Sequence, residues 1–233
     1  MSDHILSAFD RDLEAVQALV VKMGGIVEEQ ILNSARALET RDADLAKTVR
    51  ERDRAVDQLE EKINEEAARL IALRAPAARD LRVALSVIKI SASLERVGDY
   101  AKNIAKRSKV LLDSPPINGT PAAIRRMAQA TEAMLKDALD SYIQRDVDLA
   151  RDVRTRDLEV DQMYNALFRE FLTYMLEDPR NITPCMHLHF IAKNIERMGD
   201  HATSIAEQVI YLVTGELPDD TRPKSSSVIE TEV

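Results

Sequence analysis

The chain has 233 residues and carries 32 Lys and Arg against 40 Asp and Glu, a formal charge of −8. Hydrophobic residues make up 45% and charged residues 31%, a balance typical of globular rather than disordered proteins. With only 6 Gly, 8 Pro and no Trp, the turn residues are too few for the many short strands of a β-sandwich or barrel. The acidic balance and the 4% of aromatic residues also argue against a nucleic-acid-binding surface. The composition therefore favours a few long helices.

The N-terminal residues contain no basic stretch followed by an apolar core, so they do not resemble a secretory signal, and we expect the protein to stay in the cytoplasm. No stretch approaches the roughly 20 apolar residues that cross a bilayer. The single cysteine, Cys185, cannot form an internal disulfide, which is consistent with a reducing compartment. We interpret Cys185 as a small helix residue, because no activating partner is fixed beside it.

Apolar residues recur at three- and four-residue intervals over residues 9–38, which predicts a long helix with one buried stripe. A second such run begins near residue 43 and ends before Pro76, since proline lacks the N–H that a helix interior requires. A third run covers about 77–112. Residues 113–121 then contain three prolines and a glycine, and we predict that they form a linker.

After this linker the helical pattern starts again. We predict helices over about 121–142 and 146–176, and a last helix from the turn at 178–184 to about residue 214. Thr183 followed by Pro184 is typical of an N-cap and first-turn pair, and Gly215 is well placed to stop the last helix. Residues 216–233, with two prolines and three consecutive serines, are expected to form a mobile tail.

The two halves share residues at a nearly fixed offset. Ten residues recur 104 positions later: Asp42, Asp44, Leu45, Ala46, Val49, Arg50, Asp53, Val56, Asp57 and Gln58. After a slip of three residues, the segment from Glu95 to Asp99 recurs 101 positions later, from Glu196 to Asp200. This internal duplication predicts an all-α protein, a tandem repeat of two similar three-helix bundles. We place the first repeat at 1–112, the linker at 113–121, the second repeat at 122–215 and the tail at 216–233.

Paired acids stand at matching places in both repeats. Residues i and i+4 of a helix lie on one face, one turn apart, so each pair points two carboxylates in one direction. A single pair is weak evidence in a chain this acidic, but repetition makes chance a poor explanation. The pairs are Asp53 with Asp57, Glu95 with Asp99, Asp157 with Asp161, and Glu196 with Asp200.

Consecutive helices joined by a short turn run antiparallel, so the two acidic pairs of each repeat are expected to face each other. Four carboxylates would then converge on one patch per bundle. Such a patch repels itself unless it is protonated or binds cations, and an all-oxygen set suits Mg²⁺, Mn²⁺, Ca²⁺ or iron. We therefore predict a cluster of two or more ions in each patch, and expect the net negative charge to be localised in these two places.

Gly98 and Gly199 occupy the same interior helix position in both repeats, where glycine costs roughly 0.5 to 1 kcal/mol relative to alanine. The missing side chain allows either a metal patch or a neighbouring helix to approach the backbone, and the sequence leaves both open. Arg96 and Arg197 beside the acids are interpreted mainly as solvated residues.

The four histidines are less informative than the acids. His201 follows Asp200, but its side chain points about a quarter turn or more away, so we favour a role other than direct metal ligation. We interpret His187, His189 and His4 as packing or surface residues.

Further short motifs accompany the acidic pairs. They are Asp80-Leu-Arg82 ahead of the third predicted helix and Ile210-Tyr-Leu-Val-Thr-Gly215 at the end of the last one. Together with the duplicated Glu-Arg-x-Gly-Asp segments and Asp-x-x-x-Asp pairs, they make the chain resemble the PhoU family of phosphate-specific transport system accessory proteins, over all but the tail. The turn at 178–183 lacks the Asp-Leu-Arg of the first repeat, so a role for Asp80 or Arg82 need not be duplicated.

This resemblance implies a cytoplasmic regulator rather than an enzyme. It would keep the phosphate-starvation regulon off and restrain uptake, contacting the ATP-binding subunit of the phosphate ABC transporter and the phosphate-sensing histidine kinase, and reaching the membrane only through these partners. Family members often form homodimers or larger oligomers. They bind multinuclear clusters of divalent or trivalent ions, with iron, manganese, magnesium and zinc as the candidates here. The implied metal ligands are Asp53, Asp57, Glu95, Asp99, Asp157, Asp161, Glu196 and Asp200.

An alternative function is a carboxylate-bridged di-metal oxidoreductase, because helical bundles with inward-facing acids also support di-iron chemistry. The Glu-x-x-His signature of such enzymes is missing, since Gly98 and Gly199 stand three residues after Glu95 and Glu196. The sequence therefore favours the regulator.

Overall fold

The computed structural model describes residues 2–76, 79–117 and 119–218, and over these residues the protein is all-α, as the sequence predicts. The elements are α1 (Ser2–Thr40), α2 (Ala43–Arg74), α3 (Arg79–Leu111), α4 (Thr120–Gln144), α5 (Val147–Glu177), a short 3₁₀ turn η1 (Pro179–Asn181) and α6 (Ile182–Thr214). None of the described helices combines the length and apolarity that crossing a membrane requires.

The same tight turn connects the first two helices of each repeat. Arg41 and Arg145 both adopt left-handed backbone conformations, with φ of 55° and 58°. The next residue is an aspartate that caps the following helix: the carboxylate of Asp42 accepts a hydrogen bond from the Leu45 N–H, and that of Asp146 does the same for its own helix. The duplicated sequence thus folds into a duplicated local structure.

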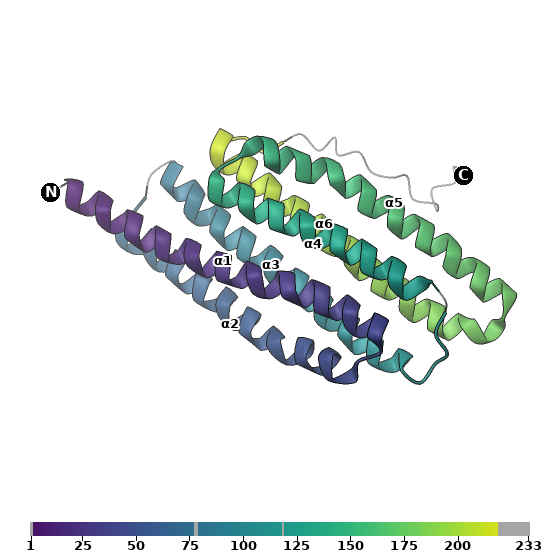
Figure 1. The fold of residues 1–233 in the computed structure, drawn as a ribbon. Helices are drawn as coiled ribbons and strands as arrows, with labels where there is room; N and C mark the ends of the chain where they lie inside the picture. The colour runs from purple at the N-terminus through teal and green to yellow at the C-terminus, as the bar shows by residue number, and fades with distance from the viewer. Residues whose placement is uncertain (1, 77–78, 118, 219–233) are drawn as a thin grey trace.

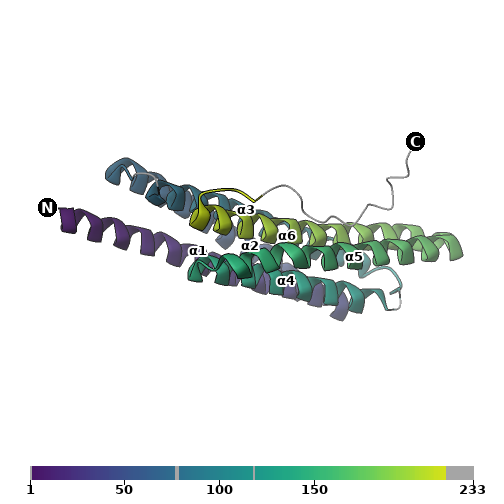
Figure 2. The same cartoon turned by 90° about the horizontal axis from the view of Figure 1, so that it is seen from above.

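The six helices form two three-helix bundles that lie side by side (Figure 1). Helix α3 packs along α6 and α1 packs along α4, so these four helices form the centre of the molecule. Helices α2 and α5 flank them, and the described residues of α2 contact only α1 and α3. Figure 2 shows that the two bundles are shifted along their common axis, which makes the molecule elongated.

One hydrophobic core runs through both bundles. Its largest fully buried side chains include Met23 of α1, Leu94 of α3, Tyr142 of α4 and Phe171 of α5. Burying each such side chain contributes about 1.5 to 3 kcal/mol relative to leaving it in water. The two repeats are therefore joined by a shared core and not only by the chain between them.

The termini of two helices also meet across the repeats. Gly215 ends α6 with a φ of 88°, as its placement in the sequence predicts. The guanidinium of Arg82, at the start of α3, lies directly against Gly215, so any side chain at that position would collide with it. Arg82 of the Asp-Leu-Arg motif thus places a cation at the carbonyl end of α6, where a helix dipole favours positive charge.

The prediction that Thr183 caps the last helix is wrong. Helix α6 already begins at Ile182, and Thr183 and Pro184 lie inside its first turn. The reason is the preceding Asp178, whose carboxylate accepts a hydrogen bond from the Arg180 N–H at 2.9 Å and starts a 3₁₀ turn that leads directly into α6. Of the predicted tail, 219–233 lies outside the described residues.

Candidate metal centre

Helices α2 and α3 bring the acidic pairs of the first repeat together, as predicted. The carboxyl of Asp53 feels the charges of Asp57 and Asp99, and that of Glu95 feels Asp99 and Asp57. A lysine lies among them: Lys102 Nζ is 2.5 Å from Asp53 Oδ2 and 3.2 Å from Asp99 Oδ1. Lys102 therefore links the two helices through the same carboxylates that were predicted to bind metal.

Burial shapes the protonation of this first cluster. Loss of water raises the pKa of Asp53, whose side chain is 4% exposed, and it raises the pKa of Glu95, with Asp99 as the next cause. The hydrogen bond that Lys102 donates to Asp53 raises the pKa of Lys102 well above its ordinary value. Arg96 lies with its Nε 3.5 Å from Glu95 Oε2 and is largely exposed, in line with a solvated arginine. The cluster thus favours a cation.

The sequence reasoning missed a fifth acid in this cluster. Burial raises the pKa of Glu60, and its carboxyl feels the charge of Asp57 and contributes to the raised pKa of Glu95. Glu60 lies three residues after Asp57, on the same helix face, which is the signal that could have found it. In the second repeat its counterpart is Tyr164, so the two clusters are not identical.

Helices α5 and α6 form the corresponding second cluster. Burial raises the pKa of Glu196, and the charges of Asp200 and Asp161 raise it further. A different lysine pairs with a carboxylate of this cluster: Lys193 Nζ lies 2.6 Å from Glu196 Oε1. The other oxygen, Oε2, is buried without a hydrogen-bond partner, and a cation would satisfy it. Asp157 is also buried in this region, with 5% of its surface exposed.

The two helix glycines permit the close approach of the acidic helices. A Cβ on Gly98 would lie 3.3 Å from both Gln30 Oε1 and Val56 Cγ1, and one on Gly199 would lie 3.0 Å from Asp157 Oδ1. The close approach of a neighbouring helix is confirmed at both glycines, and the approach of a metal patch stays a prediction. The missing side chain admits a valine of the neighbouring helix and also the carboxylate beside it.

The donor set of both clusters fits hard cations, because it consists of carboxylate oxygens. Among the residues that the structure describes, however, no three Asp, Glu, His or Cys side chains are gathered as closely as a metal ion needs. The lysine ammonium groups neutralise the carboxylates instead. The assignment of the eight acids as metal ligands therefore stays a prediction.

The described histidines lie at the edge of these clusters or away from them. The ring of His201 stacks at a tilt on that of Tyr100, with 5.8 Å between centroids, and burial lowers its pKa. His189 packs against Phe168 at 5.3 Å, as a packing residue does. His187 Nδ1 is 3.5 Å from a guanidinium nitrogen of α3. Cys185 is buried in α6, as expected of a small helix residue.

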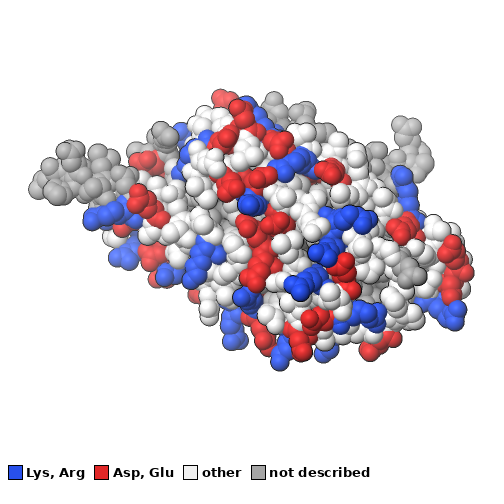
Figure 3. All heavy atoms as spheres, viewed as in Figure 1, with Lys and Arg blue, Asp and Glu red and all other residues white. Residues whose placement is uncertain are grey.

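The expectation that the negative charge is confined to two patches is wrong. Figure 3 shows an acidic band across the face formed by α1 and α4. There, burial raises the pKa of Glu28, and the charges of Glu132 and Asp140 raise it further. This band unites residues of two helices that lie far apart in the sequence, and their contact was not predictable from spacing.

The comparisons with known proteins agree with this architecture. The PhoU domain matches residues 20–108 and 124–209, that is, one stretch in each repeat. The chain belongs to the PhoU family. It is 47% identical to a PhoU homolog of Caulobacter vibrioides over 224 residues, 96% of this chain and 97% of that one. The crystal structure of PhoU from Pseudomonas aeruginosa superposes with a TM-score of 0.86 at 40% identity, covering 89% and 100% of the two chains.

A PhoU of lower sequence identity also has the same fold. The crystal structure of the phosphate transport system regulatory protein PhoU from Streptococcus pneumoniae is 29% identical and superposes with a TM-score of 0.83, over 91% of this chain and 99% of that one. This chain thus shares its fold with both of these PhoU crystal structures.

Proposed function

We propose that this PhoU family member is an accessory regulator of phosphate transport, acting in the cytoplasm. The observation that carries the proposal is its 47% identity, over nearly the full length of both chains, to a relative named phosphate-specific transport system accessory protein PhoU homolog. The Streptococcus pneumoniae structure is likewise named a phosphate transport system regulatory protein. In detail, the protein would repress the phosphate-starvation regulon and restrain uptake when phosphate is plentiful.

This regulation requires contact with membrane-associated partners. The proposed ones are the ATP-binding subunit of the phosphate ABC transporter and the phosphate-sensing histidine kinase, with the protein itself acting as a homodimer or larger oligomer. Capture of the tagged protein from phosphate-replete cells should recover both partners. Deleting its gene should switch on alkaline phosphatase in high phosphate, and restoring the gene should reverse this. Unchanged repression in the deletion strain would overturn the regulatory role.

The carboxylate clusters are proposed as the metal sites of this regulator. Bound ions of iron, manganese, magnesium or zinc would neutralise the converging carboxylates and hold α2 to α3 and α5 to α6. Three observations support the proposal: the clusters are duplicated, their donors are oxygens, and Glu196 has a buried carboxylate oxygen without a partner. Lys102 pairs with Asp53 Oδ2 and Lys193 with Glu196 Oε1, and both lysines would have to release these two oxygens for a metal to bind them.

Elemental analysis of the purified protein tests this assignment. The test variant replaces Glu95, Asp99, Glu196 and Asp200 by Ala and should lose most of the metal. Glu61 and Glu65 supply a matched control, because they are an exposed acid pair at the same spacing on α2, outside both clusters. Replacing both by Ala should leave the metal content unchanged. Equal metal content in all three proteins would contradict the ligand assignment.

The oxidoreductase alternative is distinguished by activity. The proposed regulator is not an enzyme, so protein loaded with iron should consume no oxygen beyond that of a matched iron control. Sustained oxygen consumption that is lost in the Glu95, Asp99, Glu196 and Asp200 variant would favour the di-iron enzyme instead.

A further inference from the structure

A groove of about 530 Å³ lies between the start of α2 and the end of α3 in the first repeat. Its lining includes four basic and two acidic side chains: Lys47, Arg50, Lys102, Lys109, Asp44 and Glu51. Lys102 is already engaged by the carboxylates of the first cluster. In the described part of the chain, no ion pair involves Arg50 or Lys109, so these two cations of the groove have no carboxylate within ion-pair distance.

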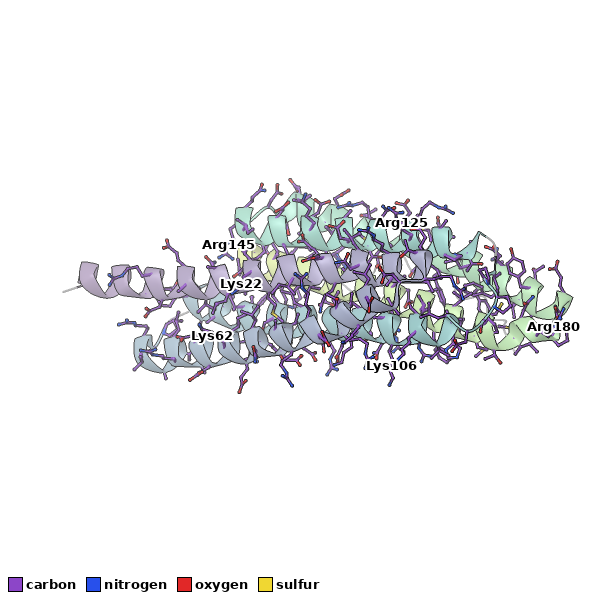
Figure 4. All side chains as sticks on the ribbon, turned by 60° about the horizontal axis from the view of Figure 1, so that its bottom comes forward. Lys22, Lys62, Lys106, Arg125, Arg145 and Arg180 are labelled. Carbon is purple, nitrogen blue, oxygen red and sulfur yellow. The ribbon has the colours of Figure 1, made fainter. Side chains whose placement is uncertain are left out.

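The second repeat contains the counterpart of this groove, and there the arginine is neutralised by an ion pair within the chain. In the second repeat Arg154, the counterpart of Arg50, donates to Glu207 Oε1 from its Nε at 3.2 Å. In the first repeat the counterpart of Glu207 is Lys106. The same ancestral position thus carries an ion pair in one copy and two cations in the other. Lys106 is exposed on α3, at the edge of the bundle (Figure 4).

The second copy of the groove is also smaller. Its volume is about 250 Å³, and residues 216–218, which follow α6, form part of its wall. Ile210 stands there in place of Lys109, so one further cation is missing. The first groove is therefore the larger and the more positively charged of the two.

We propose that the groove of the first repeat binds a small anion with two or more linked phosphate groups. Its volume falls in the range of small-molecule sites, and a single orthophosphate would fill only a small part of it. Arg50 offers a planar fork of N–H donors and Lys109 adds a point charge from α3, a combination suited to several phosphate oxygens. Lys106 does not line the groove, but it adds positive charge on α3 next to Ala105 of the lining. This groove adjoins the first carboxylate cluster through Lys102, but Arg50 and Lys109 are not part of that cluster, and failure of the proposal would leave the regulatory role standing.

Binding is measured by calorimetry on the full chain after treatment with a chelator, so that metal cannot bridge the anion to the carboxylates. The probes are inorganic triphosphate and ATP. Triphosphate should bind saturably and more weakly as salt rises, because salt screens exposed charges. Tighter binding of ATP than of triphosphate would identify a nucleotide as the ligand, and equal binding would identify an inorganic oligophosphate.

Two variants locate the site. Arg50→Gln combined with Lys109→Gln should weaken triphosphate binding about tenfold or more, as expected when charged hydrogen bonds are lost. The matched control, Arg36→Gln combined with Arg126→Gln, removes the same charge from exposed residues outside the groove and should change binding less than twofold.

The third variant, Lys106→Glu, copies the charge pattern of the second repeat. The new glutamate should pair with Arg50 and abolish triphosphate binding. The thermal unfolding temperature should stay unchanged or rise, which would show that the loss of binding is not a loss of folding. The proposal is overturned if triphosphate does not bind, if the groove variants bind as the wild type does, or if orthophosphate binds equally well. Tighter binding of an acidic peptide than of triphosphate would also overturn it, in favour of a protein partner.

Discussion

Replacing Gly199 by Ala tests whether the helix glycines are required by the close approach of the acidic helices. Alanine gains up to about 1 kcal/mol of helix propensity over glycine. At this position, however, the new Cβ would lie 3.0 Å from Asp157 Oδ1, closer than the roughly 3.5 Å at which nonbonded atoms attract best. The Asp157 carboxylate is buried and has little room to retreat, and overpacking of this kind costs about 1 to 3 kcal/mol.

Gly25 provides the matched control. It lies in the interior of α1, is exposed, and has no atom within 4 Å of where its Cβ would lie. Gly25→Ala should therefore raise the free energy of unfolding by about 0.5 to 1 kcal/mol. At Gly98 the new Cβ would have its nearest contacts at 3.3 Å, so the change in unfolding free energy for Gly98→Ala should lie between those for Gly25→Ala and Gly199→Ala.

The assay is urea unfolding of the metal-free protein, followed by circular dichroism. The free energy of unfolding should rank Gly25→Ala highest, then the wild type, with Gly199→Ala lowest by about 1 to 2 kcal/mol relative to the wild type. If Gly199→Ala proved as stabilising as Gly25→Ala, the close approach of Asp157 to α6 would not limit this position, and our account of the close packing of α5 against α6 would be refuted.

Three further predictions concern charges and caps. Lys102→Met should lower the unfolding free energy of the metal-free protein at pH 7 by about 1 to 3 kcal/mol, because it leaves the buried Asp53 carboxylate unpaired; an unchanged urea midpoint would contradict this. Burial raises the pKa of Glu196 above its ordinary 4.5, so its stabilising contribution is complete below pH 4.5 and is lost as the pH rises through the raised value. Glu196→Gln should therefore gain stability relative to the wild type between pH 4 and pH 7 in urea titrations, whereas the exposed control Glu61→Gln should show no such trend. Asp146→Ala removes the cap of α5 and should cost about 1 kcal/mol in thermal unfolding, more than Asp148→Ala in the same turn.

Most of the local structure was predictable, because it depends on residues close together in the chain. The three- and four-residue periodicity located all six long helices, and the aspartates after Arg41 and Arg145 start α2 and α5 as helix caps do. The predicted start of α6 was wrong, although it also depends on residues that are close together in the chain. The Asp178 turn competed with the Thr183 cap, and the sequence did not show which would prevail.

The facing of the acidic pairs was also predictable, since a short turn forces α2 against α3 and α5 against α6 and the i, i+4 spacing sets the face. The lysines among these acids were not. Lys102 follows Asp99 by three residues and Lys193 precedes Glu196 by three, so the repeats place their cations at non-equivalent positions. Which side chain turns toward a carboxylate depends on rotamers and burial, and spacing along the chain does not specify these.

By itself the sequence determined the helices, the duplication, the family and the facing carboxylates, because each follows from short-range periodicity or from residues repeated at a fixed offset. Only the tertiary structure decided that α3 packs along α6 and α1 along α4, that the acids of α1 and α4 form a band, and that one α2–α3 groove stays cationic. The physical reason is that apolar burial drives helices together without directional preference, so the pairing of distant helices depends on how all six surfaces fit at once.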